Sequence, residues 1–386
     1  MKTYISLLLM LLASQNLQAQ FSSDRFEAGG YIQMMPVRIA AELPPPLGDS
    51  ELWELRLQNR LNTRWNLSDG LTLNAHLRTR LFYGDLIRQI PGYAEGIDSD
   101  TGIVHLSFLL AEENSWLVHT QPDRLNIDWN RGDWRITAGR QRINWGINSV
   151  TNPNDLFNIY SFYEFDYPER PGSDAVRIQY FRNWASRIEL AWRPARELSN
   201  SVAAALFAFN TGGYDVQMIS GYYRGRLAAG GGWAGSIRQS GFKGEMMLFT
   251  DLEKERSPQQ TTLIAGLSAD HMFGNGLFMI LEGLYNSAAG LDNFSLLGGS
   301  FAPDNPGFSR WQLSVQGSYP LSPILDGSLA FVLYPDQEAL FVSPSVRWSV
   351  IENLDLNLLM QIFTGSSDSP FGRSGSVMAA SLVWNF

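Results

Sequence analysis

Arginine side chains recur on one face of the stretch between positions 51 and 83. Two runs in this stretch alternate strictly between polar and apolar residues, and basic residues occupy many of the polar positions. The guanidinium group stays charged and presents a planar fork that matches carboxylate and phosphate groups. Together with residues of later strands, the side chains expected to line this polar face are Arg56, Arg60, Arg64, His76, Arg78, Arg80, Arg140, Arg142, Arg177, Arg187 and Arg193.

The basic residues are unevenly placed. Of the 29 basic residues 26 are arginine, and 17 of those 26 lie between positions 51 and 200, whereas the polar positions of later strands carry Ser, Asn and Gln. A ladder of arginines along one wall of a pore favours anions, because charged walls set selectivity. The same arginines can instead pair with acids such as Glu54, Asp128 and Glu189 and stiffen the wall. The sequence leaves both interpretations open.

The apolar face of the same stretch predicts a membrane. Its residues run from Trp53 to Trp65 in the first run and from Leu71 to Tyr83 in the second, and successive strand side chains point to opposite sides of a sheet. A strand of a soluble domain has about five or six residues. A tilted strand needs roughly nine to eleven to cross a bilayer, and both runs are long enough. The alternative is one face of a soluble β-sandwich.

The same alternation predicts an all-β fold, a single transmembrane antiparallel up-and-down β-barrel. We expect 18 strands, or 16 if the glycine-rich region 201–250 holds one hairpin fewer, and either size leaves an aqueous lumen. Long and short connections alternate, as in outer-membrane barrels. The expected strands lie near 26–36, 51–67, 71–83, 123–130, 134–144, 174–182, 186–194, 201–209, 214–223, 227–238, 242–250, 261–272, 277–286, 309–319, 324–334, 339–350, 354–363 and 374–386.

The two ends of the sequence predict export and insertion. Residues 1–19 have the charged start, apolar run and small residue before Gln20 that are typical of a cleaved secretory signal peptide, which leaves 20–386 as the barrel. The last strand alternates and stops on Phe386, and it resembles the terminal strand of bacterial outer-membrane barrels. That resemblance implies the outer membrane of a Gram-negative bacterium, with outer-membrane lipid and the barrel-assembly machinery as partners.

A second resemblance covers about forty residues from Trp134. A Gly-Arg-Gln strand runs into Trp145-Gly146 and then into an Asn-Pro-x-Asp loop, a pattern similar to that of porin-like barrels, including alginate-export-type ones and related uncharacterised families. The resemblance implies transport of a solute through the barrel. Strict alternation would turn Arg140 and Arg142 toward lipid, so we expect a β-bulge at Gly139 that returns both side chains, with Asn144, to the lumen.

The segment 145–173 is longer than a connector needs. We expect it to fold inward and narrow the pore, with Asp155, Glu169, Arg170 and Asp174 as anchors; the alternative is an outward loop held by its own turns.

Other functional classes fit the sequence poorly. The chain has no cysteine and a net charge of -9, which argue against disulfides, thiol chemistry and nucleic acid. Its four histidines show no metal-ligand spacing, so we expect no metal, no cofactor and no enzyme. A hydrolytic site at the rim would have to use His105 or His119 in the segment 84–122.

The sequence therefore predicts a passive channel for small polar or anionic solutes. Two alternatives remain: an accessory barrel that exports or anchors an anionic polysaccharide, and a structural surface barrel with a blocked lumen. The solute, the direction of transport and the oligomeric state are not encoded in any pattern that we find.

Overall fold

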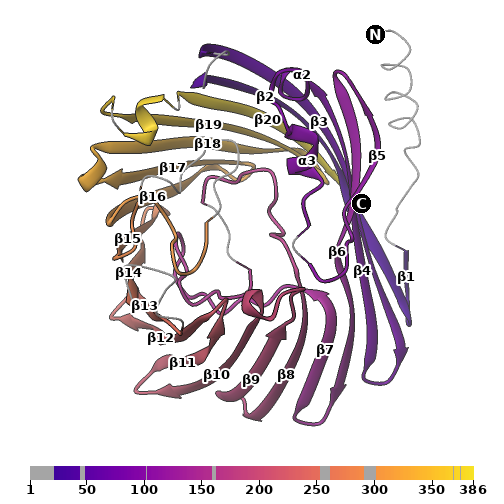
Figure 1. The fold of residues 1–386 in the computed structure, drawn as a ribbon, viewed down its shortest axis with the longest axis vertical. Coiled ribbons are helices and arrows are strands. Elements are labelled where there is room, and N and C mark those ends of the chain that lie inside the picture. The colour runs from indigo at the N-terminus through magenta and orange to yellow at the C-terminus, as the bar shows by residue number, and fades with distance from the viewer. Residues whose placement is uncertain are drawn as a thin grey trace.

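The strands close into one ring (Figure 1). The structure, a computed structural model, describes residues 21–43, 48–100, 102–158, 162–252, 261–290, 301–367, 369–373 and 375–386, so the expected signal peptide lies outside the described residues. Of the twenty described strands, β1 and β5 each pair with only one neighbour, and the other eighteen form an antiparallel barrel that closes where β20 pairs with β2.

The strands have the following bounds: β1 Phe21–Ser23, β2 Phe26–Leu43, β3 Gly48–Ser68, β4 Leu71–Gly84, β5 Phe108–Glu113, β6 Trp116–Arg131, β7 Trp134–Gln141, β8 Ser173–Asn183, β9 Ser186–Arg193, β10 Val202–Thr211, β11 Tyr214–Tyr223, β12 Arg226–Ile237, β13 Ser240–Asp251, β14 Thr261–Met272, β15 Phe278–Asn286, β16 Trp311–Ser322, β17 Leu325–Tyr334, β18 Ala339–Ile351, β19 Leu354–Gly365 and β20 Ser376–Asn385. The helices are α2 Asp85–Gln89 and α3 Tyr93–Ile97, with 3-10 turns at Leu198–Asn200, Pro335–Gln337 and Pro370–Arg373. Among the described residues, no helix is long and apolar enough to cross a membrane.

The predicted count of eighteen strands is confirmed, and the alternative of sixteen is wrong. The glycine-rich middle holds four strands, because the Gly230–Gly232 run of β12 pairs with both β11 and β13. A Cβ at Gly230 or Gly231 would meet the carbonyl oxygen of Met246 or Gln217, so glycine suits this closely paired strand. The largest differences from the expected bounds are in three strands: β2 continues to Leu43 and does not end near 36, β6 begins at Trp116 and not near 123, and β7 ends at Gln141 and not at 144.

The outer face of the barrel is apolar. Large apolar side chains such as Trp53, Leu61, Leu77 and Tyr83 are exposed, whereas Arg60 and Arg78, which alternate with them, are buried inside the ring. The sequence pattern and the barrel therefore agree on which face points outward.

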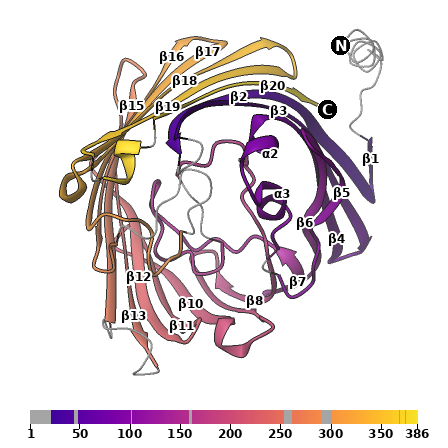
Figure 2. The ribbon, with the colours of Figure 1, turned by 45° about the horizontal axis from the view of Figure 1, so that its top comes forward.

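The interior is partly filled by the chain itself. Figure 2 shows α2, α3 and the connection from β7 to β8 inside the ring of strands. Apolar side chains from the inner faces of β10 to β15, among them Leu206, Ile219, Met247, Phe249 and Ile264, pack against this connection. The expectation that later strands face the lumen with Ser, Asn and Gln is therefore incomplete, because part of their inner face is a hydrophobic contact surface.

Candidate functional site

The connection between β7 and β8, described at 142–158 and 162–172, lies inside the barrel and is tied to distant strands; we call it the connection 142–172. The carbonyl oxygen of Trp145 accepts a hydrogen bond from Gln217 on β11, at 2.6 Å. The carbonyl of Tyr163 accepts one from Gln361 on β19, at 2.9 Å. Asp166 forms an ion pair with Arg56 on β3, at 2.6 Å. The connection therefore folds inward and meets the wall on several sides.

Glu245 on β13 holds the first part of the connection. Its carboxylate accepts hydrogen bonds from the backbone N–H groups of Ile147, Asn148 and Asn154, the last two at 2.5 and 3.1 Å. Hydrogen bonds to a charged group are among the stronger ones in proteins. A single side chain thus fixes two segments of the connection at once.

Glu282 on β15 repeats this arrangement at residues 149–151, which lie between the two segments that Glu245 holds. Its carboxylate accepts the N–H groups of Ser149, Val150 and Thr151 at 3.0, 3.1 and 2.9 Å. Gln312 on β16 then donates to the hydroxyl of Thr151 at 3.2 Å.

Two glycines make room for this contact beside Glu245. Gly232 on β12 and Gly266 on β14 are the cross-strand partners of Glu245, one on each side. A Cβ at Gly266 would lie 2.6 Å from the side-chain nitrogen of Asn148, and one at Gly232 would lie 3.2 Å from that of Asn154. Glu245 with its two flanking glycines forms a socket for the connection, which we call the Glu245 socket.

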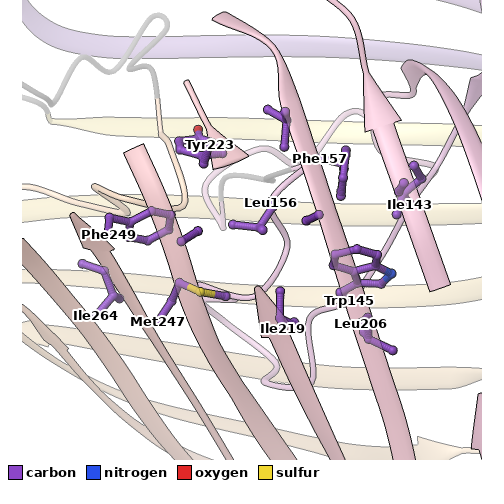
Figure 3. Packing of buried hydrophobic residues seen from close by; sticks show 14 of the residues in the cluster. Ile143, Trp145, Leu156, Phe157, Leu206, Ile219, Tyr223, Met247, Phe249 and Ile264 are labelled. Atoms are coloured by element: carbon purple, nitrogen blue, oxygen red, sulfur yellow. The ribbon is translucent and has the colours of Figure 1, made fainter. Parts of the chain in front are cut away.

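Apolar packing adds to these hydrogen bonds (Figure 3). Leu156 of the connection lies on the side of Met247 and Phe249 of β13, whereas Phe157 lies beside Ile143 and Trp145. The ring of Trp145 lies edge-on to that of Phe157 with centroids 5.1 Å apart. Burying each such side chain stabilises the arrangement by about 1.5–3 kcal/mol.

Aromatic rings hold the middle of the connection against β18 and β19. The ring of Tyr163 lies 5.1 Å from that of Phe341 and 5.7 Å from that of Phe363, and its hydroxyl contacts that of Tyr334.

The end of the connection reaches the arginines of β3 and β4. Arg60 and Arg78 face each other across these two strands, and like charges in such a pair repel. Acids relieve the repulsion: Arg60 pairs with Asp123, and Arg78 lies 3.9 Å from Asp166. Burial opposes ionisation of Asp166, yet nearby Arg56 and Arg78 hold its pKa below the usual range.

Tyr167 completes the contact with this wall. Its hydroxyl donates to Asp123 at 2.7 Å, and the guanidinium of Arg78 lies 4.1 Å from the centre of its ring. Glu169, a predicted anchor, accepts a hydrogen bond from Tyr31 at 3.3 Å, while Arg124 donates to the carbonyl oxygens of Glu169 and Arg170.

The predicted anchor Asp155 lies near Arg142 and Arg170, and Arg124 lies near Arg142. Burial raises the pKa of Asp155 to about 8, although Arg142 opposes the shift. Asp155 is therefore largely neutral near pH 7 and does not balance the charge of Arg142.

The remaining predicted lining residues are distributed as follows. Arg177 and Arg187 both pair with Glu189, at 2.5 and 2.7 Å, so they form the wall-stiffening network that was the alternative interpretation. Arg64 is exposed near the β3–β4 turn. His76 lies 3.4 Å from Arg60, Arg80 lies 3.1 Å from His119, and Arg193 is partly buried on β9.

The predicted bulge at Gly139 is wrong. The ladders of β7 with β6 and β8 run through Gly139 without a register shift, which leaves Arg140 on the outward side with Ala138. Arg140 is nevertheless buried, because Asp174 and Asp100 pair with its guanidinium at 2.6 and 3.0 Å. The chain around Gly102 covers this pair, which is why no bulge is needed.

Two further expectations change with this correction. Asp174 belongs to β8 and pairs with Arg140 in the wall, so it is not an anchor of the connection. Arg142 and Asn144 follow the end of β7, so the alternation of that strand does not govern them.

Sequence reasoning missed the acids that hold the interior together. Glu245 and Glu282 are buried on β13 and β15, and the residues that follow Glu245 and those on both sides of Glu282 are apolar or small. A lone acid on the inner face of such a strand is a usable signal, because a buried charge requires partners. Asp123 and Asp166 had no such signal, since one lies at an irregularity of β6 and the other in a connection.

Asp98 and Ser107, which precede β5 and follow α3, lie together with His119 of β6. The hydroxyl of Ser107 lies 2.7 Å from Nε2 of His119 and 2.8 Å from Asp98, and both Ser107 and His119 are buried. In a hydrolase triad the acid accepts from Nδ1 of the histidine, but here Arg80 occupies that side. The arrangement does not match a hydrolytic site.

The sequence matches no protein-family model, and no curated protein matches it significantly. Solved structures share its fold. Acinetobacter baumannii OccAB4 aligns over 95% of this chain and 99% of its own, with 8% identity and a TM-score of 0.59. Pseudomonas aeruginosa OccK11 aligns over 94% and 96%, with 11% identity and a TM-score of 0.57. The chain therefore shares the fold of these two solved structures, and in this chain that fold is a closed barrel.

Proposed function

We propose that this protein is an outer-membrane channel for the passive passage of small polar or anionic solutes. The observation that carries the proposal is a closed barrel with an apolar outer face whose interior is crossed by a connection tied to charged walls. An inward segment of this kind sets the width and charge of a pore, and the ring of strands leaves no open edge toward lipid.

The outer face supports a membrane location. Trp53, Trp129, Trp134 and Tyr83 are exposed near strand ends, where aromatic side chains favour the boundary between lipid and water. Export by a signal peptide at 1–19 belongs to the same proposal, as does the location in the outer membrane of a Gram-negative bacterium.

The preference for anions rests on arginines that lack acidic partners. Arg80, Arg124 and Arg142 form no ion pair with a carboxylate among the described residues, whereas Arg56 and Arg60 are neutralised by Glu54, Asp123 and Asp166. The wall is thus both stiffened by ion pairs and left with a local positive surplus.

Single-channel recording in planar bilayers tests the proposal. We expect ion conductance, and a reversal potential in a KCl gradient that shows preference for chloride. Arg142→Gln should weaken this preference, while Arg347→Gln, whose side chain is 62% exposed beside Asp355, should leave it unchanged. Preference for potassium in the unaltered protein would contradict the anion proposal.

A structural barrel with a blocked lumen is the second candidate. The packing of Tyr163 against Phe341 and Phe363 inside the ring favours it, because such contacts exclude water. Folded protein that inserts into bilayers without conducting ions would favour this candidate over a channel.

A further inference from the structure

An apolar groove lies on the outer face of the barrel, away from the connection in its interior. It crosses β18, β19, β20 and β2 and reaches Trp53 on β3, with a volume of about 600 Å³. Pro36 and Arg38 in its wall are exposed and alternate with Val37, which is buried inside the ring. The groove therefore opens outward, and under the proposed membrane location it faces lipid.

Two prolines shape this groove. The ladder of β2 with β20 pairs Met34 with Leu382 and Val37 with Ala379, and it is interrupted between them at Pro36. The ladder of β18 with β19 is interrupted in the same way at Pro344, between Val342 and Ser345. Proline has no N–H to donate, so it weakens strand pairing where it stands.

The hollow lies between these interruptions. The β19–β20 ladder that separates them is continuous, and Ala380 on β20 is a small outward residue beside the larger Met360 and Met378. The groove is therefore a feature of sequence and register, built by two prolines and a small side chain.

One end of the groove carries a positive charge. Arg38 is the cross-strand partner of Trp53, an exposed aromatic near the loop end of the barrel. The guanidinium of Arg38 contacts Glu51 at 2.7 Å, and both side chains are more than half exposed. An exposed ion pair of this kind contributes little to stability, so an anion that binds guanidinium more tightly than the Glu51 carboxylate can displace Glu51 from Arg38.

We propose that this groove binds one acyl chain of a lipid whose phosphate headgroup contacts Arg38. The apolar floor accommodates the chain, and the arginine beside the aromatic residue lies at the level where headgroups meet water. The phosphate binds the planar guanidinium in competition with Glu51. The inference depends on the proposed membrane location and is independent of whether the barrel conducts.

Native mass spectrometry of the detergent-purified barrel tests the groove. With phosphatidylglycerol we expect one retained lipid per barrel, and Ala380→Phe, which fills the groove, should abolish most of this retention. The control is Val315→Phe on the outer face of β16, which should retain lipid as the unaltered protein does. Equal retention by both variants, or no lipid bound by the unaltered protein, would overturn the proposal.

The charge of the headgroup is tested separately. Arg38→Gln should reduce the retention of phosphatidylglycerol about fivefold, whereas Arg347→Gln should not. Unchanged retention of phosphatidylglycerol in Arg38→Gln would contradict the role of Arg38.

Two further measurements separate the alternatives. If the unaltered protein is an oligomer that Ala380→Phe converts to a monomer, the groove is occupied by a second copy and the lipid proposal fails. Heat-modifiable migration on gels shows that each variant is folded. A barrel that binds lipid without conducting ions would support this inference while the channel proposal fails.

Discussion

Arg60 and Asp123 form an ion pair that is almost fully inside the protein, with each side chain 2% exposed. Removing one member of a buried pair leaves an uncompensated charge. We expect Asp123→Asn to lower the free energy of unfolding by about 3 kcal/mol, because Glu169, 3.6 Å from Arg60, compensates only in part. Equilibrium unfolding by urea in lipid vesicles measures the loss.

Arg347 and Asp355 provide the matched control for this experiment, since Arg347 is 62% exposed. Arg347→Gln should change the free energy of unfolding by at most about 1 kcal/mol. Similar losses in the two variants would show that burial does not determine the strength of the Arg60–Asp123 pair.

Asp155 should make the ion preference depend on pH. Burial raises its pKa to about 8, above the usual value near 4. Because the pKa is higher in the folded protein, protonation of Asp155 stabilises the fold. This stabilisation is complete below about pH 4, declines as the pH rises, and is lost once the pH has passed about 8. The charge that then forms offsets the neighbouring arginines, so preference for chloride should fall between pH 7 and 9. Reversal potentials at the two pH values measure the change.

Asp155→Asn removes this titration and should reduce the fall in preference for chloride over that interval. Glu164, whose pKa is raised to about 7 by burial and by Asp166, also loses its proton in the lower part of the interval and accounts for the change that remains. A fall of the same size in Asp155→Asn would exclude Asp155 as the titrating group.

Among the elements, the connection 142–172 is held by the Glu245 socket. Glu245→Gln replaces one of the two oxygens that accept three backbone N–H groups with an NH2 group, which cannot accept a hydrogen bond. Leaving buried N–H groups without an acceptor costs on the order of 3 kcal/mol, which increases the released population of the connection about a hundredfold. We expect faster cleavage within 142–172 by a protease added to the vesicles, together with larger and noisier single-channel currents.

Glu352→Gln is the control for the socket, because Glu352 is exposed in the β18–β19 turn. Its cleavage rate and currents should equal those of the unaltered protein. A Glu245→Gln variant that behaves like this control would show that the apolar contacts of Leu156 and Phe157 hold the connection without the socket.

The sequence predicts the elements better than it predicts the contacts between them, and the Glu245 socket is an example. The length and aromatic content of the connection predicted an inward fold, but its anchoring acids lie about ninety and one hundred and thirty residues downstream. The pair Arg60–Asp123 depends on a register shift in β6 beside Asp123. Arg140 depends on cover from the chain around Gly102. Such contacts follow from tertiary packing, which strand alternation does not encode.

For the whole molecule, the outer face could be read from the sequence because every strand repeats the same two-residue pattern against one apolar environment. The inner face has no single environment: it meets water, the connection 142–172 and the helices α2 and α3. Phe249 and Met247 face inward and are buried against the connection. Because apolar residues occur on both faces of this strand, hydrophobicity alone does not show which of them face lipid and which face the interior. The strand count was therefore predictable, and the interior was not.

The ring of strands should survive without the connection that crosses it. Gln141 and Ser173, which flank the connection, are cross-strand partners in the ladder of β7 with β8. A turn of about four residues can therefore join the two strands as a hairpin. We expect a variant with residues 142–172 replaced by such a turn to fold as a barrel, with conductance well above that of the unaltered protein.

Its stability should fall by several kcal/mol, because inward residues such as Met247 and Phe249 lose their contacts with the connection, at about 1.5–3 kcal/mol for each side chain. Planar-bilayer recording and urea unfolding measure the two effects. A shortened barrel that folds but conducts no better than the unaltered protein would show that α2, α3 or another part of the chain, and not the connection, limits the bore.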